Sequence, residues 1–160
     1  MVIKQLAEDK SRICRMVLAA LPVWFGIPEA IDSYCEDVQR QPLFAASDGE
    51  QTIGFLALEL HNPYTAEIHV MGILPAYQRR GIGRSLLEAS EEYCRECGKV
   101  MLLVKTLDSS HPDIYYARTR EFYLAMGFVP LQVLEGYWGE SNPCLLMGKP
   151  LCRDVNVPDG

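Results

Sequence analysis

The chain has 160 residues, of which 49% are hydrophobic and 22% charged, so it is long enough for one domain with a hydrophobic core and unlike a disordered or fibrous protein. Its formal net charge of -6 argues against nucleic acid or an anionic membrane as the main partner. The longest apolar run, from Met16 to Pro28, is shorter than the roughly 20 residues that cross a bilayer. Because "MVIKQL" has no secretory pattern, we expect a cytoplasmic protein.

The first half of the chain predicts a strand, two helices and a hairpin. Residues 1–6 alternate as a strand does, and residues 10–21 have the apolar spacing of a helix that ends before a proline. A second helix is expected over 28–40, with a proline in its first turn. Strands over 43–47 and 52–60 flank a tight Asp-Gly turn, which is the pattern of a β-hairpin.

The middle of the chain predicts a crossover unit of strand, helix and strand. Residues 66–74 and 100–106 read as strands, and the intervening residues 83–96 read as a helix ended by Gly98. Strict alternation along the first of these strands would put Glu67, His69, Met71 and Ile73 on one face, and Ile68, Val70 and Leu74 on the other.

The last part predicts a helix over 115–126, stopped by a glycine, and a final hairpin of strands over 128–137 and 144–149. The element order is therefore β-α-α-β-β-β-α-β-α-β-β, in a single mixed α/β domain. We place this domain at residues 1–150 and a C-terminal tail at 151–160.

The six cysteines are expected to be reduced thiols, because a mid-sized chain without an export signal seldom carries a disulfide framework. Cys94 and Cys97 have the spacing of half a zinc site or of a redox dithiol, but no second pair stands at a matching distance. Their helical spacing with Leu86 favours packing as small apolar residues. No metal is expected.

The stretch "AYQRRGIGRSLLEASEEYC" places Gly81 and Gly83 between a predicted strand and a predicted helix. The first N–H groups of a helix lack intrahelical acceptors, and glycines let a phosphate approach them closely. Neither a Walker loop nor a dinucleotide fingerprint fits the spacing. Taken alone, the stretch is equally compatible with a tight turn that carries solvated arginines. Those arginines are Arg79, Arg80 and Arg84.

The longer stretch "GILPAYQRRGIGRSLLEASEEYCRECG" resembles the acyl-CoA signature of the GCN5-related N-acetyltransferase (GNAT) superfamily, Q/R-x-x-G-x-G/A after the fourth strand. Gln78, Gly81 and Gly83 occupy its named positions. "TREFYLAMGF" resembles the second signature, and the resemblance covers about residues 3–150. It implies a twisted, mixed and mostly antiparallel sheet flanked by helices, with acetyl-CoA as co-substrate and no metal.

The resemblance also implies roles for individual residues. The pyrophosphate of acetyl-CoA would rest on the turn that contains Gln78, Arg79, Arg80, Gly81, Ile82, Gly83 and Arg84. The pantetheine arm would pair with Met71, Gly72 and Ile73 like an added strand. Tyr123 matches the position of a general acid near the CoA sulfur. Glu67 is expected as the base, with His69 as its competitor.

On the acceptor side, the resemblance points to the loop with Trp24 and Phe25 and to His111 as substrate contacts. His111 could instead only shape a turn. Five aromatic residues could form an apolar pocket for the amine or could instead belong to the hydrophobic core: Trp24, Phe25, Tyr115, Tyr116 and Trp138.

We therefore expect an N-acetyltransferase that acts on a primary amine of a small molecule. The alternatives are a peptide or protein amine, or a CoA-binding module without turnover. A homodimer is possible, because edge strands near the C-terminus are open to pairing.

Overall fold

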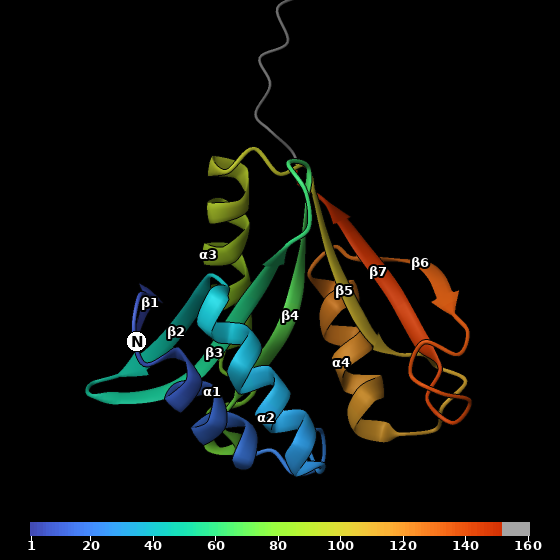
Figure 1. Cartoon of the computed structure of the whole chain (residues 1–160), viewed down its shortest axis with the longest axis horizontal. Helices are drawn as coiled ribbons and strands as arrows, with labels where there is room; N and C mark the ends of the chain where they lie inside the picture. The colour runs from blue at the N-terminus through green and yellow to red at the C-terminus, as the bar shows by residue number, and fades with distance from the viewer. Residues whose placement is uncertain (152–160) are drawn as a thin grey trace, which may run out of the picture.

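The computed structural model describes residues 1–151, which form one seven-stranded sheet flanked by four α-helices (Figure 1). The strands are β1 (Val2–Leu6), β2 (Leu43–Asp48), β3 (Gln51–Leu60), β4 (Thr65–Ile73), β5 (Met101–Leu107), β6 (Val129–Leu134) and β7 (Cys144–Pro150). The helices are α1 (Lys10–Ala19), α2 (Pro28–Asp37), α3 (Ile82–Glu96) and α4 (Ile114–Ala125), with short 3₁₀ turns η1 (Val38–Arg40) and η2 (Pro75–Tyr77).

The strands follow the spatial order β1-β2-β3-β4-β5-β7-β6. Every neighbouring pair is antiparallel except β4 and β5, which are parallel and joined through α3. This arrangement confirms the predicted element order and the mixed, mostly antiparallel sheet. β7, the second strand of the C-terminal hairpin, pairs with β5. β6, the first strand of that hairpin, therefore forms the edge of the sheet.

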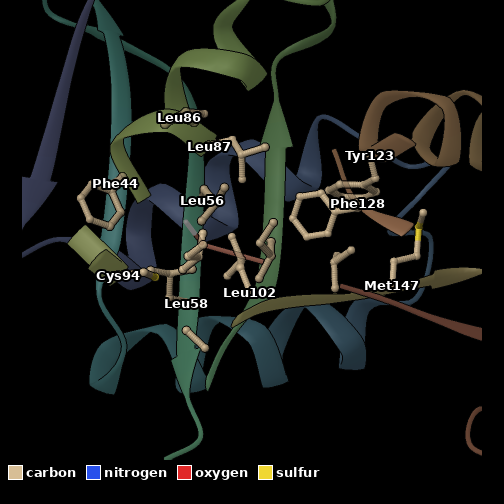
Figure 2. Close-up of a cluster of buried hydrophobic side chains, with 14 of the residues drawn as sticks. Phe44, Leu56, Leu58, Leu86, Leu87, Cys94, Leu102, Tyr123, Phe128 and Met147 are labelled. Carbon is tan, nitrogen blue, oxygen red and sulfur yellow. The ribbon is translucent and has the colours of Figure 1, made fainter. Parts of the chain in front are cut away.

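Two hydrophobic clusters pack on opposite faces of the sheet. Leu86 of α3, Phe128 and Met147 belong to the first cluster, which Figure 2 shows, and each is 1% exposed or less. Val17 and Phe55, both fully buried, belong to the second cluster, under α1 and α2. The central strands are therefore covered on both sides. Each of their side chains that does not point into one core points into the other.

The predicted alternation along β4 is wrong beyond Ile68. Ala57 of β3 pairs with Val70 and Leu58 pairs with Ile68, so His69 is an extra residue and forms a β-bulge. Because a bulge shifts the alternation by one residue, Val70 packs in the α1/α2 core, whereas Met71 packs against the α3/α4 core. Met71 and Ile73 thus lie on the face opposite to Glu67 and His69, and not on the same face as predicted.

β4 and β5 separate where this bulge begins. Their parallel pairing ends at Ile68 and Val104, although β4 continues to Ile73 and β5 to Leu107. Figure 1 shows the two strands close together at one end and diverging towards the other. The unpaired stretches leave an opening in the middle of the sheet, between its two layers of helices.

Several predicted boundaries differ from those of the structure. The helix expected over 10–21 ends at Ala19, and the one expected over 28–40 gives way to the 3₁₀ turn at Val38. The strand expected over 128–137 ends at Leu134, since a turn with Gly136 at φ 73° follows. Leu151, placed in the tail by the sequence analysis, is 3% exposed and donates its N–H to the Val100 carbonyl. The rest of that tail lies outside the described residues.

The cysteines in residues 1–151 are all free thiols, and Cys152 lies outside the described residues. Cys94 is fully buried as predicted, whereas Cys97, which follows the last residue of α3, is exposed and the prediction for it is wrong. Within the same residues, no group of three or more His, Cys, Asp or Glu side chains could hold a metal ion. No helix among them is long and apolar enough to cross a membrane.

Candidate active site

The turn between β4 and α3 exposes backbone N–H groups. Gly81, which precedes the helix, has φ 78°, and Arg79 has φ 62°. The first helical hydrogen bond runs from the Ser85 N–H to the Gly81 carbonyl at 3.1 Å, so the amides of residues 82–84 have no helical acceptor. Gln78 Nε2 donates to the Ile73 carbonyl at 3.0 Å and holds the turn to the end of β4. This geometry suits an anion at the positive end of α3.

The two glycines of the turn are required for different reasons. At Gly81 no described atom lies within 4 Å of an added Cβ, but its left-handed backbone disfavours other residues. Gly83 has ordinary helical geometry, and a Cβ there would meet Phe122 Cζ at 3.2 Å and Met71 Cε at 3.3 Å. Gly83 therefore allows α3 to approach α4 and β4 closely.

A cleft of about 860 Å³ occupies the opening between the separated strands. Its volume lies in the range of small-molecule sites. Gln78, Arg79 and Gly83 line it near the turn, and residues 67–73 of β4 and 104–107 of β5 form its walls. Arg80, Gly81, Ile82 and Arg84 belong to the same turn and first helical turn, but do not line this volume. The cleft also reaches α4 and the loop between α1 and α2.

Tyr123 lies on the α3/α4 side of the cleft and is 6% exposed. Its hydroxyl donates to Met71 Sδ at 3.9 Å, and its ring packs edge-on against Phe122 and Phe128. Burial raises the pKa of the Tyr123 hydroxyl above the ordinary tyrosine value. The hydroxyl therefore keeps its proton at neutral pH and is available as a donor.

Glu67 lies on the other face of β4 and is only 7% exposed. Lys105 Nζ bonds to its two oxygens at 2.9 and 3.0 Å, and His61 Nε2 lies 2.8 Å from Oε1. Burial of Lys105 lowers the pKa of its ammonium group, but the hydrogen bond and charge of Glu67 outweigh this effect and the pKa is raised. Lys105 thus remains charged and neutralises Glu67.

His69, the bulge residue, is held by α2. Its Nε2 lies 2.9 Å from Asp37 Oδ2, and its ring meets Tyr34 edge-on with centroids 5.4 Å apart. An ionised carboxylate can only accept, so in the neutral form of the imidazole Nε2 carries the proton and Nδ1 keeps its lone pair. The imidazole lines both the main cleft and a second cavity of about 440 Å³, in which Asp37 also takes part. His69 therefore connects the two cavities with an oriented imidazole.

The loop between α1 and α2 meets the start of α4 across the cleft. The rings of Trp24 and Tyr115 are edge-on with centroids 5.3 Å apart, and the Tyr116 hydroxyl donates to the Trp24 carbonyl at 3.3 Å. Phe25 packs edge-on against Tyr34 at 5.8 Å. All five side chains line the cleft, as does Trp138. Trp24, Phe25 and Tyr34 also pack against the α1/α2 core, so these side chains belong both to the core margin and to the wall of the cleft.

The structure does not bring His111 to this cleft. His111 Nδ1 accepts the N–H of Asp113 at 3.3 Å, and His111 is not among the described residues that line either cavity. Asp113 caps α4 by accepting the N–H groups of Tyr115 and Tyr116 at 2.8 and 3.2 Å. The turn interpretation accounts for the contacts of His111.

Tyr34, Asp37 and Lys105 are residues of this candidate site that the sequence analysis missed. Asp37 meets His69 across 32 positions of sequence, and nothing in the local pattern marks it. Lys105 had a usable signal, because it is the one charge within the apolar strand "MLLVKTL". A charge in such a strand needs a partner, and Glu67 on a neighbouring strand was the obvious candidate.

The model of the Acetyltransferase (GNAT) family matches residues 11–128. The chain therefore belongs to this family of acetyltransferases. A mycothiol acetyltransferase from Rhodococcus erythropolis is 34% identical over 140 residues, which cover 69% of this chain and 47% of that protein. One from Corynebacterium glutamicum is 38% identical over 60 residues, covering 36% of this chain and 20% of that protein. The chain thus spans less than half the length of these curated relatives.

Solved structures show the same fold at low identity. A GNAT-family structure from Desulfovibrio desulfuricans has a TM-score of 0.82 at 20% identity, covering 94% of this chain and 99% of that one. The aminoglycoside 6'-N-acetyltransferase from Enterococcus faecium has a TM-score of 0.77 at 18% identity, covering 98% and 100%. A family member from Elizabethkingia anophelis with acetyl-CoA bound has a TM-score of 0.72 at 19% identity, covering 93% and 97%.

The buried tyrosine predicts a pH dependence of stability. Because its folded-state pKa is raised, the contribution of Tyr123 is fully present below the unfolded value of about 10 and is lost as the pH rises above it. Tyr123→Phe should therefore show a shallower loss of unfolding free energy above about pH 10, measured by urea denaturation. Tyr64→Phe, at an exposed turn residue, is the matched control and should keep the wild-type slope. An unchanged slope in Tyr123→Phe would contradict the burial argument.

Proposed function

We propose that this acetyltransferase uses acetyl-CoA and transfers the acetyl group to a primary amine of a small molecule by direct attack on the thioester. The observation that carries the proposal is the opening between β4 and β5. It joins the buried hydroxyl of Tyr123 on one face of the sheet to the oriented imidazole of His69 on the other. A thioester and an amine that enter from opposite faces would meet there.

The turn before α3 supports the first half of this proposal. Its unpaired amides and arginines offer a site for the pyrophosphate of acetyl-CoA. Met71, Gly72 and Ile73 lie on the stretch of β4 that has no β5 partner, so the pantetheine arm can pair there as an added strand. A backbone N–H of this edge would also stabilise the thioester carbonyl as negative charge develops on its oxygen.

In the reaction, the amine nitrogen forms a bond to the thioester carbon, and the carbon–sulfur bond then breaks. The thiolate takes a proton from the Tyr123 hydroxyl, and the amine loses one to the base. We assign the base to His69, since Asp37 leaves its Nδ1 lone pair available and stabilises the imidazolium. Glu67 remains the alternative, although Lys105 and His61 already occupy its oxygens.

The second cavity gives the proton a way out. His69 lines both cavities, whereas Asp37 lines only the second one. A proton taken up from the amine in the main cleft can therefore leave on the other side of the imidazole, away from the thioester.

The names of the relatives refer to mycothiol and to aminoglycosides, and these different names do not define the acceptor of this chain.

Gly81→Val should weaken acetyl-CoA binding at least about tenfold, because a β-branched residue resists φ 78° and would turn the amides away from the phosphates. Isothermal calorimetry with acetyl-CoA measures the change. Gly49→Val is the matched control, since Gly49 has φ 61°, has equally open space and lies in the β2–β3 turn. Equal affinities for the two variants would remove the turn from the site.

Tyr123→Phe should lower kcat by about 10²-fold if its hydroxyl protonates the leaving thiolate. Release of free thiol from acetyl-CoA, followed in the presence of an amine panel, measures the rate. The affinity for acetyl-CoA should stay unchanged, which separates the proton-transfer role from a packing role. Full activity in Tyr123→Phe would reject this assignment.

The base is tested by comparing His69→Asn with Glu67→Gln. His69→Asn should lower kcat by about 10²-fold or more and abolish the rise of kcat with pH on the acid side. Glu67→Gln should lose activity through the unpaired Lys105 but retain that rise. The opposite result, with the rise lost only in Glu67→Gln, would assign the base to Glu67.

A further inference from the structure

The acceptor end of the cleft is lined by aromatic side chains from three separate segments. They come from the α1–α2 loop and α2, from the start of α4, and from the β6–β7 connection: Trp24, Phe25, Tyr34, Tyr115, Tyr116 and Trp138. Leu21, Ile27 and Ala30 add aliphatic surface. Burial raises the pKa values of Tyr34 and Tyr116, so both hydroxyls stay neutral. This end of the cleft, which we call the aromatic chamber, therefore offers ring faces and apolar area, with the Arg118 guanidinium 6.0 Å from the centroid of the Tyr115 ring.

The charged residues around the cleft do not favour a polycation. Its charged lining consists of two carboxylates, Glu67 and Glu121, against three cations, Arg79, Lys105 and Arg118, a formal balance of +1. The buried one of the two carboxylates, Glu67, is already paired with Lys105. Several ammonium groups on one substrate would meet cations with few free carboxylates to bind them.

The second cavity lowers the formal balance only from +1 to zero, because it adds two carboxylates and one cation, Arg40. It contains two further carboxylates, Asp37 and Glu59. Asp37 bonds to His69 and lies 3.6 Å from Arg40, and Glu59 accepts a hydrogen bond from Gln41 Nε2 at 2.5 Å. A second ammonium group of the substrate would have to displace a partner of Asp37, whereas Glu59 has the neutral Gln41 amide as its partner.

We propose that the natural acceptor is a monoamine whose body is flat and apolar, of the arylalkylamine class, with its ring held in the aromatic chamber and its single nitrogen directed to His69. This proposal rests on the proposed function. Ring-on-ring contacts and burial of apolar area would bind the body of the acceptor, and they do not require any charge besides the reacting nitrogen. Polyamines, aminoglycosides and peptide N-termini are the competing acceptor classes.

Direct binding tests the proposal independently of turnover. The chain has only two tryptophans, Trp24 and Trp138, and both line the cleft, so intrinsic fluorescence reports its occupancy. With the protein saturated by CoA, 2-phenylethylamine should bind at least about tenfold more tightly than spermidine, kanamycin or a hexapeptide with a free N-terminus. Equal or tighter binding of any of these three would overturn the proposal.

Two substitutions of Trp24 test where the ring of 2-phenylethylamine binds. Trp24→Ala should weaken 2-phenylethylamine binding about tenfold by calorimetry, and Trp24→Phe should restore most of the affinity. Neither change should alter the affinity for CoA. Tyr64→Ala is the matched control, because Tyr64 is an exposed aromatic residue in the β3–β4 turn and does not line the cleft. The same loss of affinity in Tyr64→Ala, or no loss in Trp24→Ala, would contradict the proposal that the ring binds in the aromatic chamber.

Binding and turnover separate this inference from the proposed function. Selective binding of 2-phenylethylamine without thiol release would support the aromatic chamber and reject the proposed acetyl transfer to it. Thiol release with spermidine or kanamycin at a higher kcat/KM than with 2-phenylethylamine would support the proposed function and overturn the acceptor class.

Discussion

The early end of the pairing between β4 and β5 is the constraint on which the rest of the site depends. Pairing stops at Ile68, and the bulge at His69 shifts the following side chains to the opposite face. One irregularity therefore opens the middle of the sheet, frees an edge of β4, and divides the reactive groups between two faces. Met71 joins Tyr123 on one side, while Glu67 and His69 face the α2 side on the other.

The buried charges near the opening are paired, because burying an unpaired ion costs free energy. Glu67, at 7% exposure, is stable there because Lys105 and His61 bond to it, and this pairing occupies both of its oxygens. His69 has a single carboxylate partner that orients it and leaves one nitrogen available. The two residues stand two positions apart on one strand, yet Glu67 has its ion-pair partner on β5 and His69 has its carboxylate partner on α2.

Much of the fold could be predicted from the sequence because its signals are local. Periodicity and turn residues indicated the helices and strands in the right order, with errors of a few residues at their ends, and the glycine turn before α3 was located from Gly81 and Gly83 alone. The faces of β4 were predicted wrongly, because a bulge depends on pairing with β3 and leaves no mark in the alternation itself. Cys97 was expected to pack as a small apolar residue because of its helical spacing with Leu86, but it lies just beyond the end of the helix and is exposed.

By itself, then, the sequence determined the elements, their order and the glycine turn before α3, all of which depend on backbone preferences within a few neighbouring residues. Only the tertiary structure decided which side chains share the cleft. Asp37 meets His69, Lys105 meets Glu67, and Trp24 meets Tyr115 across large distances in sequence. Such contacts follow from how two cores pack on the faces of one sheet, and a single sequence does not state that packing.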